Sequence, residues 1–189
     1  INARSIKKDY PHEVIKYVDI SSVTVGRLLT TTEYQMDSAP SRAQRLVAHG
    51  DTIWSCVRPN RKSFLFIHQP DETLVVSTGF AVITPKQVPP CYLYAWVTAD
   101  DFVDYLSYSA DGSAYPAVRP DRFAVAVILL PPKSILDQFE TIVGRLRDRI
   151  ATNERESVAL AATRDALLPK LLSGKLCVPE AQKKVGFAV

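Results

Sequence analysis

The sequence has 189 residues, of which 47% are hydrophobic, and a formal net charge of +3 at pH 7. This length allows one domain of ordinary size with an appendage, and the apolar content is sufficient for a packed core. So weak a positive charge does not by itself indicate a nucleic-acid partner, which makes the positions of the arginines and lysines decisive. The sequence has no signal peptide and no apolar run long enough to span a bilayer.

The cysteines and histidines indicate neither disulfides nor a metal site. Cys56, Cys91 and Cys177 are far apart and odd in number. Cys56 and Cys91 lie in apolar surroundings and are predicted to be buried thiols, which favours a reducing cytoplasm. The three histidines lack the spacing of zinc ligands. We therefore predict no metal and a cytoplasmic protein.

The first half of the chain predicts a β-rich core with short connections. Residues 1–13 are polar and are expected to be loose, residues 26–39 show no period and are expected to form a loop, and residues 40–48 are expected to form a short helix. A loop as long as 26–39 inside a compact domain is often a binding loop. Strands are predicted over residues 14–20, 52–57, 63–68, 74–77 and 80–84.

Helices dominate the predictions after residue 88. One helix is expected to open at Pro89-Pro90, and a second to follow Thr98 and Asp101, which have the spacing of a capping box. Residues 110–120 are predicted to form a loop, and the unbroken apolar run 123–130 to form a buried strand. This order predicts an α+β fold: a β-rich domain with a few short helices, followed by one long helix.

The long helix is predicted over residues 134–168, which contain no proline and one glycine. Ser134 and Asp137 have capping-box spacing at its start, and Pro169 is expected to end it. A helix of this length would extend about 50 Å, more than the domain can cover, so we expect it to project. Apolar residues spaced by four and three indicate a coiled-coil seam, although an amphipathic helix packed on its own domain is the alternative. The residues predicted to meet a partner helix are Ile135, Phe139, Ile142, Leu146, Ile150, Leu160 and Leu167.

Several enzyme classes can be set aside from the sequence. It contains no GxxxxGK[ST] phosphate loop, no glycine-rich turn or Asn-Pro-Pro-aromatic tetrapeptide of a base methyltransferase, no nuclease-like carboxylate and lysine spacing, and no GxSxG nucleophile motif. Asp100 and Asp101 are interpreted as helix-capping and solvated residues. We predict a binding protein with no catalytic residue and no cofactor.

The basic residues gather on three predicted connections. Arg42 and Arg45 are three apart on the expected short helix, a second group lies in the turn 58–62, and Arg119 and Arg122 follow the loop at Gly112. Arginine suits both phosphate contact and the guanine edge, and connections are where ligands are usually bound. The alternative interpretation is a set of surface salt bridges.

Several strings, in this order and spacing, resemble a target recognition domain of type I restriction–modification specificity subunits. They are Tyr17-Val18-Asp19-Ile20, the run from Ala39 to Val47, the run from Gly50 to Pro59, Ser77-Thr78-Gly79-Phe80-Ala81-Val82, Gly112-Ser113-Ala114-Tyr115-Pro116-Ala117-Val118, Leu130-Pro131-Pro132 and Leu168-Pro169-Lys170-Leu171-Leu172-Ser173-Gly174. The resemblance covers about residues 14–176.

The resemblance implies a scaffold rather than an enzyme. In this family two recognition domains each read half of a split DNA site, and each is followed by a long helix. The helices pair antiparallel, and modification subunits, and also restriction subunits, assemble on the scaffold. Here residues 1–131 would be the recognition domain, 132–175 the spacer and dimerisation helix, and 176–189 a flexible tail. The expected partners are double-stranded DNA, the modification subunits, a restriction subunit, and a second copy or second half of the subunit.

The chain departs from the family pattern in three ways. It holds one recognition domain and one helix, its opening segment looks short, and Tyr115 stands where a polar residue is expected. Because only one recognition domain and one helix are present, we expect a half-length subunit that pairs with a copy of itself or one half of a longer protein. Because Ile1 is not a methionine, we expect a processed or cut chain.

The predicted DNA contacts combine shared and variable positions. Shared arginines are expected to hold the fold or touch phosphate, and the loop 27–36 to read bases. Those contacts are Arg27, Thr30, Thr31, Thr32, Tyr34, Gln35, Arg42, Arg45, Arg58, Arg61, Lys62, Ser113, Tyr115 and Arg119. Two alternatives stay open: an assembly module that does not contact DNA, and the recognition part of a larger methyltransferase or nuclease.

Overall fold

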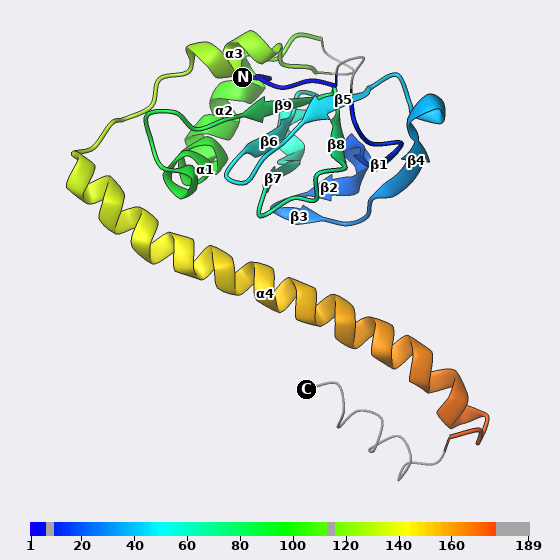
Figure 1. The fold of residues 1–189 in the computed structure, drawn as a ribbon. Helices are drawn as coiled ribbons and strands as arrows, with labels where there is room; N and C mark the ends of the chain where they lie inside the picture. The colour runs from blue at the N-terminus through cyan, green and yellow to red at the C-terminus, as the bar shows by residue number, and fades with distance from the viewer. Residues whose placement is uncertain (7–9, 113–115, 177–189) are drawn as a thin grey trace. The chain divides into compact units, whose positions relative to one another are not determined.

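The computed structural model describes residues 1–6, 10–112 and 116–176 (Figure 1). The chain divides into two compact units, one formed by residues Ile1–Val143 and one that begins at Gly144. Ser113, Tyr115 and, apart from Leu176, the tail expected from residue 176 lie outside the described residues. In the described part of the chain, no helix has the length and apolar character that a membrane crossing requires.

The first unit contains two sheets and a small hairpin. The larger sheet has the order β4-β1-β8-β5, in which β1 and β8 are parallel and the other pairs antiparallel. The second sheet is antiparallel, with β6 between β7 and β9, and β2 pairs only with β3. The strands are β1 (Val14–Val18), β2 (Val23–Thr24), β3 (Arg27–Leu28), β4 (Thr32–Gln35), β5 (Ala43–Leu46), β6 (Thr52–Ser55), β7 (Phe64–Phe66), β8 (Leu74–Ser77) and β9 (Phe80–Ile83).

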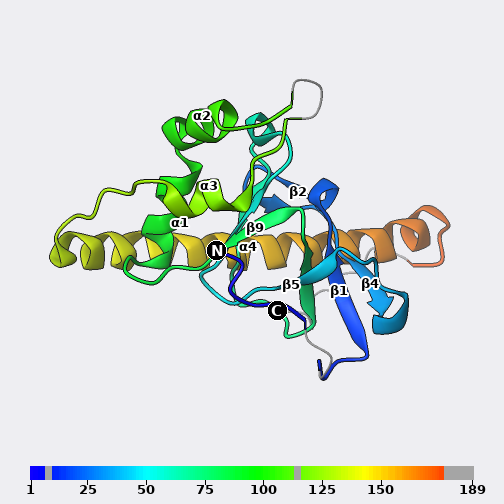
Figure 2. The same cartoon turned by 90° about the horizontal axis from the view of Figure 1, so that it is seen from above.

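Three helices cover one face of the three-stranded sheet: α1 (Pro90–Thr98), α2 (Asp100–Tyr108) and α3 (Pro120–Val125). Short 3-10 turns complete the unit as η1 (Ile20–Ser22), η2 (Met36–Ser38) and η3 (Pro59–Arg61). Figure 2 shows α1–α3 on one side of the unit and β1 and β4 on the other. The α+β class predicted from the sequence is confirmed.

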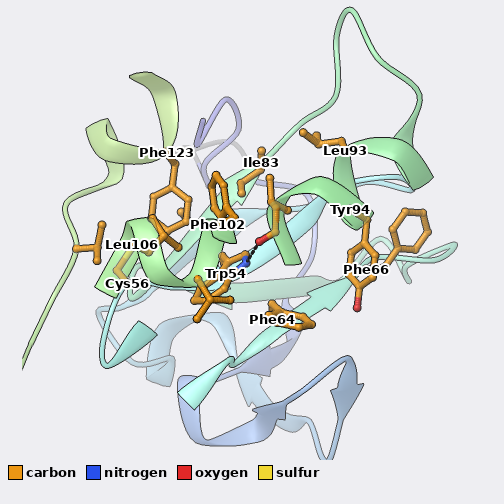
Figure 3. Close-up of a cluster of buried hydrophobic side chains, with 14 of the residues drawn as sticks. Trp54, Cys56, Phe64, Phe66, Ile83, Leu93, Tyr94, Phe102, Leu106 and Phe123 are labelled. Carbon is orange, nitrogen blue, oxygen red and sulfur yellow. Dashed lines mark hydrogen bonds between the residues drawn. The ribbon is translucent and has the colours of Figure 1, made fainter. Parts of the chain in front are cut away.

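Side chains that alternate along the strands divide the core into layers. Trp54 is fully buried toward the helices, and its Nε1 donates to the Val97 carbonyl at 2.8 Å (Figure 3). Its neighbour Ile53 points to the opposite face, where it packs in one cluster with Val18 and Val76 of the larger sheet. Both faces of β6 are therefore buried, as its four buried residues require.

Two expectations for the N-terminal part are corrected. Residues 1–6 are not loose, because Asn2 donates to the Val82 carbonyl at 2.8 Å and Ile6 to the Gln44 carbonyl at 2.9 Å. Residues 43–46 form strand β5 rather than a helix, paired antiparallel with β8. The N-terminal segment supplies hydrogen bonds to the other edge of β5, a tertiary effect that local sequence does not carry.

Three further expectations are corrected. Residues 120–125 form α3, and the following segment to Pro132 is not a strand, with Val127 86% exposed. The stretch 26–39 includes β3, β4 and η2 instead of one loop. Thr98 does not cap α2, because its hydroxyl donates to the Tyr94 carbonyl in its own helix at 2.7 Å.

Helix α4 runs from Lys133 to Leu172, 40 residues without interruption. The helix begins before Ser134, and Asp137 pairs with the Lys133 Nζ at 2.7 Å, so the expected capping box is absent from this described segment. Pro169 lies inside the last turn rather than beyond the end. The prediction that Pro169 stops the helix was therefore wrong by one turn.

The first turns of α4 belong to the core of the first unit. Leu136 is 5% exposed, Phe139 and Val143 pack against the main core cluster, and the ring centroids of Phe139 and Tyr92 are 5.7 Å apart. The Glu140 carboxylate accepts the Cys91 N–H at 3.0 Å, at the start of α1. These residues explain why the first unit extends eleven residues into the helix, from Lys133 to Val143.

Candidate nucleic-acid interface

The turn after β6 is basic and firmly built. Arg58 and Lys62 both have left-handed backbone conformations, with φ of 50° and 54°, on either side of η3. Buried Pro59 anchors this turn in the fold. The Lys62 Nζ contacts the Asp100 carboxylate at 2.7 Å, which lowers the pKa of Asp100. Arg61 is exposed at the top of the turn.

Residues 116–118 are hydrogen-bonded beside this turn. Arg58 N–H donates to the Pro116 carbonyl at 2.7 Å, and Val118 N–H donates to the Cys56 carbonyl at 2.7 Å. Arg119 follows directly and contacts Asp121 at 2.5 Å, a pairing that raises the pKa of Arg119 and lowers that of Asp121. Two of the predicted basic connections are thus brought together.

The turn between β8 and β9 joins the third connection to the other two. Thr78 N–H donates to the Arg42 carbonyl at 2.8 Å, and Cys56 N–H donates to the Gly79 carbonyl at 2.9 Å. Arg42, the β8–β9 turn, the end of β6 and the segment at Pro116 therefore lie side by side through main-chain hydrogen bonds. We call this surface, formed by Arg42, Arg58, Arg61, Lys62 and Arg119, the arginine edge.

Within the arginine edge, some side chains form ion pairs within the unit and others do not. Lys62 and Arg119 are paired with carboxylates of the same unit. Among the described residues, the exposed Arg42 and Arg61 form no ion pair. These two side chains are therefore the ones most available to an external anion.

Arg45 differs from the other arginines. It lies within β5 and is half-buried, and its burial lowers its pKa. Its neighbour Cys56 is a buried thiol whose pKa is raised by burial to about 11, so the thiol is neutral at ordinary pH. The burial predicted for Cys56 and Cys91 is confirmed. The Arg45 Nη1 is buried without a hydrogen-bond partner among the described residues, so the guanidinium lies within the fold, which favours a role in supporting the strand.

The predicted base-reading region 27–36 is divided between two places. Gly26 N–H donates to the Phe64 carbonyl at 2.9 Å, which puts the β2–β3 turn, and with it Arg27, beside the chain that leaves the basic turn. Thr32, Tyr34 and Gln35 lie instead on β4, at the opposite edge of the larger sheet from β5. Thr30 and Thr31 form the exposed connection between these places.

Tyr34 is less available than its neighbours on β4. It is half-buried and makes an edge contact with Tyr17, with ring centroids 6.1 Å apart. Thr32 and Gln35 are exposed. The region therefore does not form one surface with Arg42.

Sequence reasoning missed Thr78 as a neighbour of the arginine edge. It stands in the quoted string Ser77-Thr78-Gly79, but no role was assigned to it. The glycine marked only a break between two strands; the structure shows why it is needed, because a Cβ at this position would lie 2.3 Å from the Ile20 Cδ1. A glycine kept small by close packing indicates a tight turn, here the one that joins Arg42 to Cys56.

The second unit presents apolar side chains along its helix. Leu146, Ile150 and Leu160 are 58%, 47% and 62% exposed. Leu167 is half-buried, while Ile135 and Ile142, in the part of α4 that belongs to the first unit, are exposed. Phe139 is the exception among the predicted seam residues, because it packs on the first unit.

Among the described residues, no group of three or more His, Cys, Asp or Glu side chains is placed to hold a metal ion.

Sequence comparisons relate the chain to specificity subunits. No family model matches the sequence. The chain is 24% identical over 162 residues to the type I restriction enzyme HindI specificity subunit of Haemophilus influenzae, covering 84% of this chain and 35% of that protein. It is 37% identical over 100 residues to the type I restriction enzyme MjaIX specificity subunit of Methanocaldococcus jannaschii, covering 53% of this chain and 23% of that protein. The chain thus spans about a third or less of these relatives.

Solved structures agree with the sequence comparison. The HsdS subunit from Thermoanaerobacter tengcongensis matches with a TM-score of 0.63 and 26% identity, over 87% of this chain and 43% of that one. A chain from a structural study of complex assembly and conformational transition in the type I R-M system matches with a TM-score of 0.65 and 27% identity, over 93% of this chain and 47% of that one. Sequence and fold together therefore confirm the resemblance and relate this chain to a partial length of the specificity subunit of type I restriction–modification systems.

Proposed function

We propose that the chain recognises one half of a split DNA site and provides a scaffold for modification subunits, without catalysing a reaction itself. The arginine edge carries this proposal. Four chain segments meet there through main-chain hydrogen bonds, so exposed arginines stand on a fixed backbone. A rigid frame that presents arginines on turns suits phosphate and base contact in a groove.

The arrangement suggests different roles for the basic residues. Arg42, Arg58 and Arg61 are proposed to contact DNA. Lys62 and Arg119, already paired with Asp100 and Asp121, are proposed to hold their turns in position and to add charge to the surface. Arg45 is proposed to support β5 rather than to touch phosphate.

The exposure of the side chains in the region 27–36 reduces the number of residues that we propose to read bases. Arg27, Thr30 and Thr31, which lie in or follow the β2–β3 hairpin, remain proposed base contacts. Thr32 and Gln35 would reach DNA only where the DNA passes the edge of the sheet formed by β4. Tyr34 is proposed to pack the strand. Ser113 and Tyr115, which lie outside the described residues, remain proposed DNA contacts.

The long helix supports the scaffold part of the proposal. The recognition domain, expected over residues 1–131, would also include the first turns of α4 up to Val143, and the rest of the helix to residue 175 would be the spacer, with its exposed apolar side chains covered by a second helix. That helix would come from a second copy of the chain or from a second half of the subunit, because the full relatives are at least twice as long as this chain. Modification subunits, and a restriction subunit in the complete system, would be the further partners.

DNA selection tests the proposal directly. We would mix the chain and its modification subunits with random duplexes and sequence what is retained, expecting one enriched motif. The double variant Arg42→Ala/Arg61→Ala should lower affinity at least tenfold, by about 1 kcal/mol or more for each lost charged contact. It should also reduce the slope of log affinity against log salt by about 2, one for each lost phosphate contact.

Lys86→Ala is the matched control for this experiment. Lys86 is exposed and follows the end of β9 at Ile83, whereas the arginine edge adjoins the other end at Phe80. It should leave affinity and salt slope unchanged. If no motif is enriched, the DNA-reading proposal is wrong.

An assembly module that does not contact DNA is the second candidate, favoured by the exposed apolar residues of α4. In that case the Arg42→Ala/Arg61→Ala variant should retain the DNA affinity of the unaltered chain and still assemble with its partners.

A further inference from the structure

A pocket lies in the first unit on the helical side, between α1, α2 and the segment that leaves α3. Its volume is about 360 Å³, and it is lined chiefly by Trp96, Phe102, Tyr105, Val125 and Val127, with Asp101 at its edge. Phe102 is buried in the wall, while Val125 and Val127 are 66% and 86% exposed. The pocket is thus lined by aromatic side chains on one side and by exposed valine side chains on the other.

Side-chain hydrogen bonds hold the open side in place. Trp96 Nε1 donates to the Val127 carbonyl at 3.3 Å, and the Tyr92 hydroxyl donates to the Leu129 carbonyl at 2.8 Å. Leu129 is itself 64% exposed, which extends the apolar surface beyond the pocket. A fixed apolar surface of this kind typically marks a protein-binding site.

The charge beside the pocket is negative. Asp101 and Asp104 are exposed on the first turns of α2, and neither forms an ion pair with a described residue. Asp100, which precedes them, is neutralised by Lys62. Since these carboxylates would repel phosphate, the pocket suits a peptide segment in which an apolar side chain follows positive charge.

We propose that this pocket binds residues 183–189 of a second copy of the chain. That segment, which lies outside the described residues, reads Lys-Lys-Val-Gly-Phe-Ala-Val. Phe187 is the aromatic anchor for the pocket, and Lys183 and Lys184 face Asp101 and Asp104. An aromatic side chain in a desolvated pocket with paired charges at the rim is the usual composition of a strong contact.

A second copy, rather than the same chain, follows from the helix pairing proposed above, taken in the antiparallel arrangement that the resemblance implies; this part of the inference rests on that pairing. Antiparallel pairing brings the end of one helix beside the start of the other. The pocket lies near such a start, because α4 begins at Lys133, six residues after Val127. The contact would lock the ends of the paired helices to the recognition domains.

The test uses the full chain carrying Phe187→Ala as receptor and a fluorescein-labelled peptide of residues 179–189 as probe. We expect saturable binding by fluorescence anisotropy. The Phe187→Ala peptide should bind at least tenfold more weakly, and Asp101→Asn in the receptor should weaken binding about threefold, the effect of one exposed charge pair. Val125→Arg, at an exposed position that tolerates a long side chain, should weaken it at least tenfold.

Asp37→Asn is the matched control, because Asp37 is exposed on η2 and distant in sequence from the pocket. It should leave peptide binding unchanged, and circular dichroism should show every receptor folded. No saturable binding up to 1 mM peptide, or equal binding by the Val125→Arg and control receptors, would overturn the proposal; this ceiling corresponds to about −4 kcal/mol.

Competition by the unaltered chain distinguishes the occupants. If a second copy supplies the segment, the unaltered chain blocks the probe increasingly as its own concentration rises. Blocking that does not depend on concentration would place the segment in its own chain and overturn the second-copy assignment. A dimer by solution mass without any peptide binding would reject this proposal but leave the helix pairing standing. Peptide binding by a chain that is monomeric in solution would reject both the helix pairing and the assignment of the segment to a second copy.

Discussion

At the scale of single residues, Gly79 shows how packing shapes the arginine edge. Its carbonyl accepts the Cys56 N–H, and a Cβ in its place would lie 2.3 Å from the Ile20 Cδ1 and 3.0 Å from its Cγ1. Nothing about Gly79 alone reveals this, since Ile20 is remote in sequence. The tight turn therefore depends on a tertiary contact rather than on local backbone freedom.

Gly79→Ala should destabilise the chain by about 1 kcal/mol through overpacking against Ile20. Ile20→Val removes the Cδ1 atom, so the double variant should lose less stability than the sum of the two single changes. Urea denaturation would measure each free energy of unfolding. Additive losses in the double variant would show that Ile20 is not the obstacle.

Gly144→Ala is the matched control for this substitution. It lies in α4, and a Cβ there meets no atom within 4 Å. Because glycine is a poor helix former, this alanine should instead stabilise the chain, by up to about 1 kcal/mol.

At the scale of elements, the sequence predicted those that carry a clear period or an obvious turn. The β1, β6, β7, β8 and β9 strands were correctly predicted, as was the helix from Pro90. The β5 strand was predicted as a helix because Ser41 to Val47 has no clear alternation, and its pairing with β8 and with residues 1–6 decides its state. Long-range pairing of this kind cannot be read from a local pattern.

The prediction of a strand over residues 123–130 was wrong although its local pattern was clear. Its apolar run is what a buried strand would show, but Trp96 and Tyr92 side chains hold its carbonyls and several of its apolar side chains stay exposed. In the candidate site, spacing identified the basic groups, yet only the hydrogen bonds through Thr78 and Pro116 show that they meet. The coiled-coil seam was predicted from the period of apolar residues alone, and that period does not show that Phe139 packs against the core of the first unit.

Leu146→Asp should shift the chain from dimer to monomer if α4 pairs through the predicted seam. Leu146 is 58% exposed in the single chain, so the charge would matter little there but would be buried in a paired state. Val158→Asp is the matched control, because Val158 is 72% exposed on the same helix and outside that seam. Sedimentation equilibrium would give both masses. Equal masses for the two variants would contradict pairing through Leu146.

At the scale of the whole molecule, the helix serves two structures at once. Its first turns complete the core of the first unit through Leu136, Phe139 and Val143, and the remainder exposes the apolar residues proposed to pair. A domain boundary drawn where the helix begins would therefore cut through the core. The compact unit includes residues up to Val143.

Two shortened chains test this division. A chain ending at Pro132 should be less stable than one ending at Arg147 by several kcal/mol, since it loses Leu136, for which burial alone is worth about 2–5 kcal/mol, and the hydrogen bond from Cys91 to Glu140. Ending at Arg147 keeps one turn beyond Val143, so that this contact does not lie at the frayed end. Thermal and urea unfolding would compare the two.

The longer of the two chains should also fold cooperatively, because it keeps the core, and it should pair more weakly than the full chain, because it loses Ile150, Leu160 and Leu167 from the predicted seam. Leu136→Ala in the full chain provides the control: it should lower stability without changing the solution mass, whereas Leu146→Asp should do the reverse. If the chain ending at Pro132 proves as stable as the one ending at Arg147, the first turns of α4 contribute nothing to the domain. The whole helix would then be free to act as a spacer, and the recognition domain would be separable from it at residue 132.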